Sequence, residues 1–397
     1  MKISVEKDIL LKSLNHIQSV VERRNTIPIL SNVKIIASNE GMSLTATDLD
    51  LEIIESLDKA NTIEDGEITT SAHTLYDIVR KLPDGSSLDI KTKDNDKLEL
   101  SCGQSNFELS TLPIEDFPEM SSGEMPCNFV IDSEEFSNMI DKSKFAISTE
   151  ETRYYLNGIF FHAINNTLRS VATDGHRLAC IQANLPSGAD DIPSIIIPRK
   201  TIGEVRKLIE DIEGNINLFI SETKIRFEVT NISLTSKLID GTFPDYERVI
   251  PKTNTKIMTV KTQDFASSID RVATISSDKS KAVKFAIKDN SLILTVINPD
   301  TGTAVEKVDV NYEADELEVG FNARYLLDIA SQISGDTMTF ILEDPGAPAL
   351  INDSDHEDAT YVLMPMRVWL VHFKLSQDTN IEITNNKKSF DRIKFLK

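Results

Sequence analysis

The chain has 397 residues, enough for two to four domains at roughly 100–200 residues each. Its hydrophobic content of 40% and charged content of 26% are ordinary for a globular protein, and no apolar run reaches the ~18–20 residues of a membrane span. The net charge of −21 argues against nucleic-acid binding over the whole surface, although a basic lining could lie within an acidic exterior.

The N-terminal residues and the cysteines bear on the compartment. Residues 1–10 carry several charges and no apolar core, so we expect no signal peptide. The three cysteines, Cys102, Cys127 and Cys180, form no C-x-x-C pair and are odd in number. This disfavours a disulfide framework or a zinc site and favours free thiols in a cytoplasmic protein.

The first predicted elements are a short strand and a helix over residues 3–14. Apolar residues alternate at first and then fall at helical spacing, as at Leu10 and Leu14. The same strand-to-helix pattern returns at residues 129–140 and 258–269. The chain therefore carries an internal repeat that is far longer than the ~20–50 residues of a solenoid unit.

A second predicted helix repeats as well, at residues 71–82, 198–209 and 322–333, each with apolar residues on one face. Two short motifs also recur at a spacing of 126 residues. Ala46-Thr-Asp48 returns as Ala172-Thr-Asp174, and Phe117-Pro118 returns as Phe243-Pro244. We predict domains at 1–127, 128–255 and 256–368, followed by an atypical C-terminal extension at 369–397.

Short alternating segments lie between the predicted helices and are typical of strands. Each domain thus combines two helices with many strands, so the predicted class is α+β. Three similar domains joined head to tail can also close into a ring with a second chain. The segments are 98–102, 107–111, 225–229, 292–296 and 361–364.

Several motifs resemble the bacterial sliding-clamp family, the beta subunits of DNA polymerase III, in order and spacing from residue 1 to 368. The resemblance implies three clamp domains, each with two helices packed on antiparallel sheet, in a head-to-tail dimeric ring that encircles duplex DNA. The motifs are Thr26-Ile-Pro-Ile-Leu30, Arg153-Tyr-Tyr-Leu-Asn-Gly158, Val171-Ala-Thr-Asp-Gly-His-Arg-Leu178, Thr235-Ser-Lys-Leu238, Phe243-Pro-Asp-Tyr246 and Tyr361-Val-Leu-Met-Pro-Met-Arg-Val368.

The resemblance implies DNA contacts at Arg24, Tyr154 and Tyr155, the tyrosines by stacking. Two further DNA-binding positions depart from the family pattern, because His73 and Glu150 stand where an arginine and a glutamine are usual. The helices also carry candidate cations for the inner face of a ring, and each alone could be an ordinary surface charge. They are Lys12, Arg23, Arg24, Arg80, Lys81, Arg199, Lys200, Arg206, Lys207 and Arg271.

The resemblance further implies a hydrophobic groove for short peptides of the polymerase III alpha subunit, the clamp loader and other clamp-binding-motif proteins. Apolar side chains suit an adaptable cleft, and Arg177 and Arg248 suit a peptide carbonyl or carboxylate. The groove residues are Leu156, Thr173, Gly175, His176, Arg177, Leu178, Pro244, Arg248, Val249, Val362, Met364, Pro365, Met366 and Arg367.

The dimer interface is expected at edge strands of the first and third domains, with contacts from Phe107, Leu109, Thr274 and Ile275. The extension at 369–397 holds the only Trp and has no counterpart in the family pattern. It could be disordered, fold back over the groove, or extend a neighbouring edge strand.

Two other classes of function compete with this interpretation. An enzyme is disfavoured, since the chain has no P-loop, G-x-G-x-x-G, G-x-S-x-G or H-E-x-x-H motif. Asp48 and Asp50 alternate on a predicted strand, but two carboxylates are weak evidence for a metal, and no cofactor is expected. A protein-interaction scaffold without DNA encirclement stays open as the alternative.

Overall fold

The chain forms two compact units, residues 1–250 with 356–362 and residues 251–355 with 363–397, called unit 1 and unit 2. The computed structural model describes residues 1–23, 26–93, 97–121, 123–210, 212–276, 281–356 and 358–367, and the backbone of 373–375 and 381–383. Among these residues, every helix is too short or too polar to serve as a membrane span.

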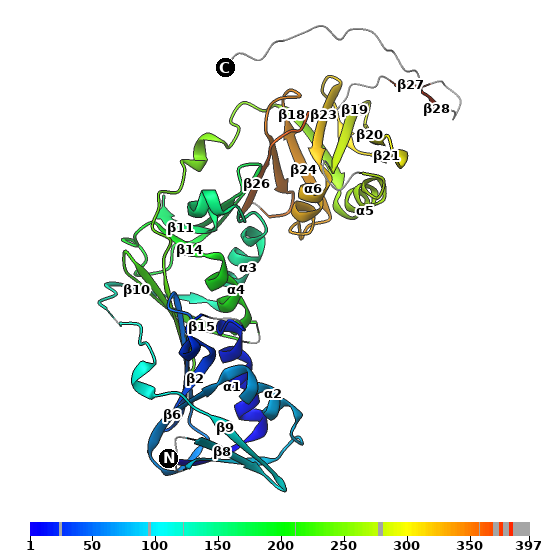
Figure 1. The fold of residues 1–397 in the computed structure, drawn as a ribbon. Coiled ribbons are helices and arrows are strands. Elements are labelled where there is room, and N and C mark those ends of the chain that lie inside the picture. The colour runs from blue at the N-terminus through cyan, green and yellow to red at the C-terminus, as the bar shows by residue number, and fades with distance from the viewer. Residues whose placement is uncertain are drawn as a thin grey trace, which may run out of the picture. The chain divides into compact units, whose positions relative to one another are not determined.

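Unit 1 begins with a repeat of two α-helices and nine strands. Figure 1 shows its helices α1 and α2 side by side. Its strands form a five-stranded sheet in the order β5-β1-β7-β8-β9 and one half of an eight-stranded sheet. The elements are β1 (Lys2–Glu6), α1 (Lys7–Val20), η1 (Pro28–Ser31), β2 (Asn32–Ser38), β3 (Gly41–Thr47), β4 (Leu51–Leu57), β5 (Asn61–Glu64), β6 (Gly66–Ser71), α2 (Ala72–Lys81), β7 (Ser87–Lys93), β8 (Lys97–Cys102), β9 (Ser105–Ser110) and η2 (Ile114–Asp116).

The second repeat of unit 1 supplies the other half of the eight-stranded sheet and the strands β14-β11-β12-β13, which β26, from much later in the chain, extends. The division between the units falls inside β26, after Val362. The elements are β10 (Cys127–Asp132), α3 (Ser133–Lys144), η3 (Glu151–Leu156), β11 (Gly158–Ile164), β12 (Thr167–Thr173), β13 (Arg177–Asn184), β14 (Ile195–Pro198), α4 (Arg199–Leu208), β15 (Asn215–Ile220), β16 (Lys224–Val229), β17 (Ile232–Lys237), η4 (Tyr246–Arg248) and β26 (Ala359–Leu363).

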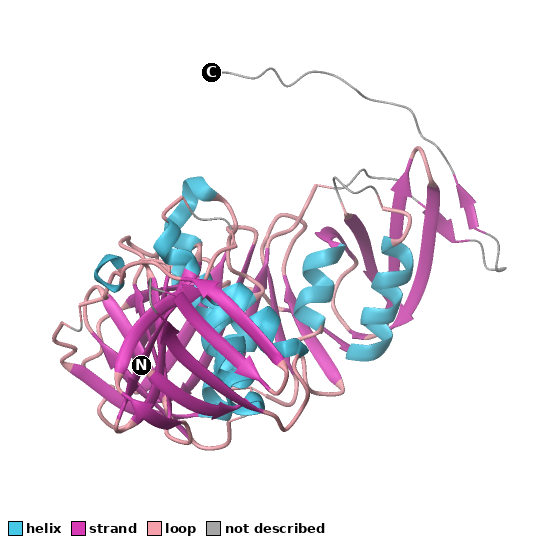
Figure 2. Ribbon diagram, turned by 60° about the horizontal axis from the view of Figure 1, so that its bottom comes forward, coloured by secondary structure: helices cyan, strands magenta, loops and turns pink. Residues whose placement is uncertain are grey.

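Unit 2 repeats the pattern with α5 and α6 side by side, and Figure 2 shows its helices against the strands. Its strands form a four-stranded sheet, β21-β20-β19-β23, and the row β25-β24-β18-β22. The elements are β18 (Lys256–Lys261), α5 (Thr262–Ala273), β19 (Ala282–Lys288), β20 (Ser291–Asn298), β21 (Gly302–Asp309), β22 (Asn311–Tyr312), β23 (Leu317–Asn322), α6 (Ala323–Ala330), β24 (Thr337–Leu342), β25 (Ala349–Asp353), and the paired β27 (Phe373–Leu375) and β28 (Ile381–Ile383).

The helices form where the sequence pattern predicts them, because one face of each is apolar. In α1, Leu10, Leu14 and Ile17 are fully buried against the sheet. The second helix of the first repeat starts where Ser71 accepts a hydrogen bond from the backbone of Thr74. All strand-to-helix pairs expected from the repeat are present, which confirms the α+β class with two helices in each repeat.

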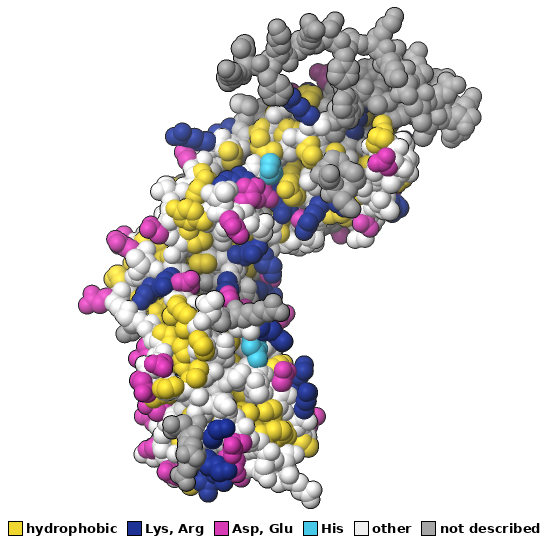
Figure 3. Space-filling model, in the orientation of Figure 1, with side chains coloured by type: hydrophobic (Ala, Val, Ile, Leu, Met, Phe, Trp, Pro, Cys, Tyr) yellow, Lys and Arg dark blue, Asp and Glu magenta, His cyan; other side chains and the backbone are white. Residues whose placement is uncertain are grey.

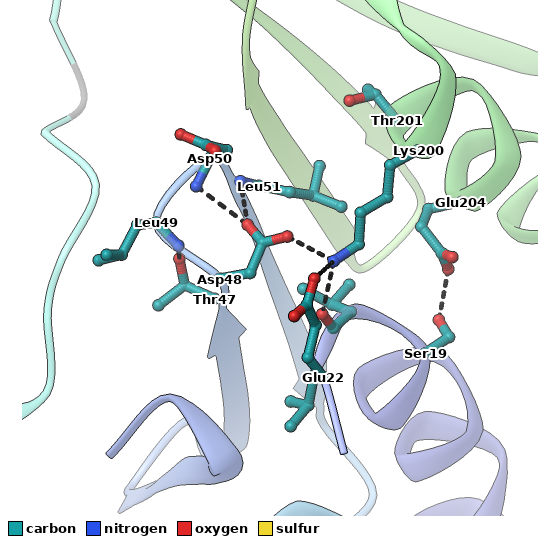
Figure 4. Close-up of polar contacts among 12 residues, drawn as sticks. Ser19, Glu22, Thr47, Asp48, Leu49, Asp50, Leu51, Lys200, Thr201 and Glu204 are labelled. Atoms are coloured by element: carbon teal, nitrogen blue, oxygen red, sulfur yellow. Dashed lines mark hydrogen bonds and ion pairs between the residues drawn. The ribbon is translucent and has the colours of Figure 1, made fainter. Parts of the chain in front are cut away.

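The two repeats of unit 1 join through an antiparallel pairing of β4 with β17, which makes the eight-stranded sheet continuous. Beside this pairing, Lys200 on α4 donates to Asp48 Oδ2 (2.5 Å), as Figure 4 shows. Lys200 also donates to the carbonyl of Val20 at the end of α1 (3.2 Å). Ser19 on α1 donates to Glu204 on α4. We call this junction of β4, β17, α1 and α4 the seam.

The expectation that Asp48 and Asp50 alternate on a strand is wrong. Both lie in the turn after β3, where Asp48 Oδ1 accepts hydrogen bonds from the backbone of Asp50 (2.9 Å) and Leu51 (2.7 Å). Asp50 pairs instead with Lys237 (3.0 Å). An aspartate that caps its own turn competes successfully with strand pairing.

Candidate functional site

The expected groove begins at the turn between β12 and β13. Thr173 Oγ1 accepts a hydrogen bond from the backbone N–H of Gly175 (3.1 Å). Asp174 Oδ1 accepts from the N–H groups of His176 (2.9 Å) and Arg177 (3.0 Å). These bonds fix the backbone of the turn, while Gly175 and His176 remain exposed at the surface.

Glycine at position 175 is favoured on two independent grounds. Its φ of +86° lies in the left-handed region that side chains disfavour. A Cβ at this position would also lie 2.5 Å from Nη1 of Arg153. Arg153 is held by an ion pair with Glu150 (2.8 Å), so the expected DNA-contacting segment packs on the groove turn.

Most of the Arg177 side chain is engaged in contacts within the protein. Its Nε donates to Asp174 Oδ2 (3.0 Å) and its Nη2 donates to the carbonyl of Phe145 (2.6 Å). The guanidinium also lies 5.0 Å from the centre of the Phe145 ring, and the side chain is only 9% exposed. The side chain stiffens the groove wall, and its expected role in orienting a peptide stays a prediction.

A second wall is offered by the loop after β17. Pro244, Arg248 and Val249 are exposed, and the Arg248 side chain is 83% exposed while pairing with Asp245 at 2.7 Å. The guanidinium of Arg248 is therefore far more accessible than that of Arg177. Val249 supplies an exposed apolar side chain beside it.

The remaining expected groove residues differ in how exposed they are and in the unit to which they belong. Leu156, Thr173, Leu178 and Val362 are buried in unit 1, whereas Met364 is 39% exposed in unit 2. Pro365 and Met366 are half-buried, Arg367 is exposed, and the backbone N–H of Met366 donates to the carbonyl of Gly320 (2.7 Å).

The two tyrosines of η3 present one exposed ring. Tyr154 is 54% exposed, Tyr155 is half-buried, and their ring centres lie 5.8 Å apart at an angle of 79°. Gly241 leaves room for the pair, since a Cβ there would lie 3.0 Å from Cβ of Tyr155. An exposed tyrosine backed by a second ring is a suitable platform for stacking a base.

The other expected DNA contacts have mixed outcomes. Arg24 lies outside the described residues. His73 is half-buried and donates from Nε2 to the carbonyl of Val21 (3.0 Å). Glu150 is exposed but paired with Arg153, which partly neutralises its charge.

Lys and Arg side chains gather along the helix side of unit 1, where Figure 3 shows them in dark blue. Lys12, Arg23, Lys81 and Arg199 are exposed, and within the described part of the chain no ion pair is recorded for them. Among the described residues, the other candidate cations are paired with acidic residues: Arg80 with Asp77, Lys200 with Asp48, Arg206 with Asp141, Lys207 with Glu204, and Arg271 with Glu306.

The residues expected at a dimer interface lie on or beside edge strands. Phe107 and Leu109 are half-buried on β9, which ends its five-stranded sheet. Thr274 and Ile275 follow α5, and the Ile275 carbonyl accepts from Asn298 Nδ2 (3.0 Å) at the end of β20. This bond places Ile275 near the hairpin that leads into β21, the edge of the four-stranded sheet.

Known proteins share this fold over nearly the whole chain. Family models of the DNA polymerase III beta subunit match its N-terminal domain at residues 1–121, its central domain at 130–245 and its C-terminal domain at 247–367. The beta sliding clamp of Caulobacter vibrioides is 50% identical over 373 residues, which cover 93% of this chain and 100% of that protein.

Solved structures agree. A sliding clamp from Bartonella birtlesii bound to griselimycin has a TM-score of 0.91 at 50% identity, and the beta subunit from Pseudomonas aeruginosa has one of 0.89 at 37% identity. Both comparisons cover 93% of this chain and 100% of the other chain. The chain belongs to the DNA polymerase III beta subunit family. It is a DNA sliding clamp, a processivity subunit with no catalytic activity of its own.

Sequence reasoning missed residues that hold the clamp's surfaces in place. Phe145 receives Arg177, and Arg153 packs over Gly175, although neither was assigned a role. Arg169 and Tyr246 lie beneath the exposed loop that carries Arg248. No sequence pattern indicates these contacts, because the partners stand far apart in the chain.

The C-terminal extension falls almost entirely outside the described residues, so its three expected roles stay predictions. The third family model ends at residue 367, and the match to the Caulobacter clamp covers 93% of the chain.

Proposed function

We propose that two copies of the chain close a head-to-tail ring around duplex DNA, using the seam as the template for the contact between copies. The observation that carries this is the pairing of β4 with β17. By the repeat, β21 of the third domain corresponds to β4, and β9 of the first domain corresponds to β17. Both β21 and β9 are edge strands of their sheets.

The seam also gives the register of the contact. In the seam, Ser233 of β17 lies opposite Ile54 of β4. When the repeats are matched by the pairings within their hairpins, Asn106 of β9 takes the place of Ser233 in β17. In the same way, Val305 of β21 takes the place of Ile54 in β4. Asn106 of one copy should therefore lie opposite Val305 of the other, with Phe107 and Leu109 beside them on β9.

Disulfide cross-linking tests this register. The double variant Asn106→Cys with Val305→Cys should form a covalent dimer under mild oxidation, visible on a denaturing gel. Each single variant controls for Cys102, Cys127 and Cys180. The variant Asn106→Cys with Lys307→Cys, two residues out of register, should cross-link far less. Equal cross-linking of both double variants would reject the register.

DNA is proposed to run past the helix side of unit 1, near Tyr154, Tyr155 and the exposed cations. Lys12, Arg23, Lys81 and Arg199 are the better targets for neutralisation, because replacing Lys200 would also break the seam. Arg24, His73 and Glu150 keep their proposed places near DNA from the family resemblance. A ring needs few phosphate contacts, since it holds DNA by topology, which suits a net charge of −21.

Retention on DNA separates a ring from a scaffold that does not encircle DNA. The chain, loaded by its clamp loader onto nicked circular duplex, should stay on circles and leave when the circle is cut. Retention that ignores the DNA ends would mean ordinary surface binding. Neutralising the four exposed cations together should shorten the residence time on circles without preventing the loss after cutting.

The peptide groove is proposed to lie at the Thr173–Leu178 turn and the Pro244–Val249 loop, with Leu156 and Val362 as buried support. The resemblance assigns Met364, Pro365, Met366 and Arg367 to the same function. Its partners are the polymerase III alpha subunit, the clamp loader and other clamp-binding-motif proteins, in the cytoplasm. Replacing Arg248 by Ala should weaken binding of the alpha subunit without changing dimerisation.

A further inference from the structure

The loop that carries Pro244, Arg248 and Val249 has little regular structure of its own. Between the end of β17 and residue 250, the only regular element is the single turn η4. A loop of this kind needs anchors if its exposed side chains are to bind a partner in one geometry. The structure shows two such anchors, Phe243 and Tyr246, which are 8% and 4% exposed.

Phe243 is held by an aromatic stack on β11. Its ring lies parallel to Phe160, with the centres 4.7 Å apart and an angle of 3° between the planes. The other side of that row is His162, 4.6 Å from Phe160. The stack fixes the start of the loop, directly before the exposed Pro244.

Tyr246 is held by a hydrogen-bonded chain. Arg169 on β12 donates from Nη1 to the Tyr246 hydroxyl (2.9 Å) and to Glu247 (2.8 Å). The hydroxyl lies 3.1 Å from Nε2 of His162. Since an arginine can only donate, the hydroxyl oxygen accepts from Arg169, and its proton is free to go to His162.

The protonation state of His162 fits donation of the Tyr246 hydroxyl proton to its Nε2. Burial, helped by the positive charge of Arg169, lowers the pKa of His162 to about 4. The imidazole is therefore neutral at pH 7, with an unprotonated Nε2 that accepts the tyrosine proton. Burial also raises the pKa of Tyr246 to about 12, so its hydroxyl keeps that proton.

One detail suggests that stability alone does not explain the chain of bonds. Within the described residues, Nε of Arg169 is buried and has no hydrogen-bond partner. Leaving a buried donor unmatched costs free energy, on the order of 1–3 kcal/mol. The arginine is thus oriented by its Nη1 contacts to the loop rather than by the best use of all its donors.

We infer that Arg169, Tyr246 and His162 are positioning residues for partner binding, because they set the conformation of the loop that presents Arg248 and Val249. This rests on the proposed groove. None of the three side chains needs to touch the partner: Tyr246 and His162 are buried below the surface, and they act through the backbone of η4.

The test compares two changes of the same kind in the full-length chain. Tyr246→Phe removes only the hydroxyl that links Arg169 to His162. Tyr312→Phe is the matched control, because the hydroxyl of the buried Tyr312 also donates a hydrogen bond, to the carbonyl of Asp315 (2.6 Å), in unit 2. The probe is the purified polymerase III alpha subunit, and its Kd is measured for each variant alongside the melting temperature.

Tyr246→Phe should raise the Kd about 3- to 10-fold, the range that one lost hydrogen bond permits. Tyr312→Phe should leave the Kd within about 2-fold while lowering the melting temperature similarly. Arg169→Met should act like Tyr246→Phe, and Arg169→Lys, which keeps a positively charged donor, should recover part of the affinity. Equal Kd values for Tyr246→Phe and the unmodified chain would overturn the inference.

A double-mutant cycle with Arg248→Ala adds a readout that a merely structural role would not move. If Tyr246 acts through the loop, the effect of Tyr246→Phe should largely disappear when Arg248 is already Ala. Strictly additive effects would also overturn the inference. Failure of the unmodified chain to bind the alpha subunit at all would instead reject the proposed groove, so the two failures are distinguishable.

Discussion

Two turns of unit 1 share one local geometry and serve different purposes. The first turn, residues 47–51, joins β3 to β4, and the second turn, residues 173–177, joins β12 to β13. The first lies in the seam between two repeats, whereas the second forms part of the proposed groove. The comparison shows how a duplicated element can be closed in one copy and left open in another.

The backbone bonds of the two turns correspond one to one. Thr47 Oγ1 accepts from the N–H two residues on at 3.0 Å, and Thr173 Oγ1 does the same at 3.1 Å. Asp48 and Asp174 each accept two further backbone bonds through Oδ1. The third residue of each turn has a positive φ, 80° in the first turn and 86° in the second.

The turns differ in what the second aspartate oxygen contacts. Asp48 Oδ2 accepts from Lys200 of the following repeat, which ties the two repeats together (Figure 4). Asp174 Oδ2 accepts from Arg177 within its own turn. The charge of Asp48 therefore stabilises a contact between two repeats. The charge of Asp174 stabilises its own turn, whose Gly175 and His176 stay exposed.

The largest expected effect comes from making the second turn resemble the first at its third residue. Gly175→Leu places a side chain at φ +86° and against Nη1 of Arg153. We expect a loss of about 1–3 kcal/mol in the free energy of unfolding from backbone strain, and at least roughly a tenfold rise in the Kd for the alpha subunit, since the turn and Arg153 must both move. Denaturant unfolding and binding titration measure the two effects.

The more conservative Gly175→Ala serves as the companion to this change. It keeps the strain at positive φ and the close approach to Arg153 but adds only one carbon. A smaller effect of the same sign is expected. Unchanged affinity in both variants would show that the second turn is not part of the partner site.

The second repeat carries an acid-sensitive side chain at a position where the first repeat has none. His162 in β11 corresponds to Ile36 in β2, and the pKa of His162 is lowered to about 4 by burial and Arg169. An unfolded histidine titrates near 6.5, so the unfolded state binds more protons between these values. The stability due to neutral His162 is therefore complete above pH 6.5 and is lost as the pH falls towards 4.

The comparison of the unmodified chain with His162→Gln measures this contribution. Glutamine can still accept a bond from Tyr246 but does not titrate. Between pH 7 and pH 4.5, the unmodified chain should lose up to about 3 kcal/mol more of its free energy of unfolding than the variant does. Arg169, Glu247 and Tyr246 lie around position 162 in both proteins, so the effect of their own titration on stability largely cancels in the comparison. Parallel losses would contradict the assignment.

A smaller effect is expected from exchanging each aspartate for asparagine. Asn keeps the Oδ1 acceptor that closes the turn but replaces Oδ2 with an NH2 group, which cannot accept a hydrogen bond. Asp48→Asn should lower the free energy of unfolding by about 1 kcal/mol and leave alpha-subunit binding unchanged, because it removes the bond from Lys200. Asp174→Asn should weaken binding instead, because it loosens Arg177. The same response from both variants would remove the functional difference between the turns.

The sequence predicted the elements well and their contacts poorly. Apolar periodicity found all three strand-to-helix pairs, and the recurring Ala-Thr-Asp motif marked both turns. The motif did not reveal that Asp48 caps a turn and meets Lys200, 152 positions away. Nor did it link Arg169 to Tyr246, because side-chain contacts between distant segments leave no periodic trace.

The smallest expected effect comes from the reverse change, in which the third residue of the first turn is replaced by the glycine of the second turn. Leu49 stands where the second turn has Gly175, and it is a 40% exposed leucine with a φ of 80°. Leu49→Gly should relieve strain of about 1–2 kcal/mol, against a cost of roughly 0.5–1 kcal/mol for the added freedom of the unfolded chain. The net result should be a gain of about 0.5 kcal/mol in the free energy of unfolding, with little lost burial. A clear loss would instead mean that the Leu49 side chain contributes contacts to the first turn that outweigh its backbone strain.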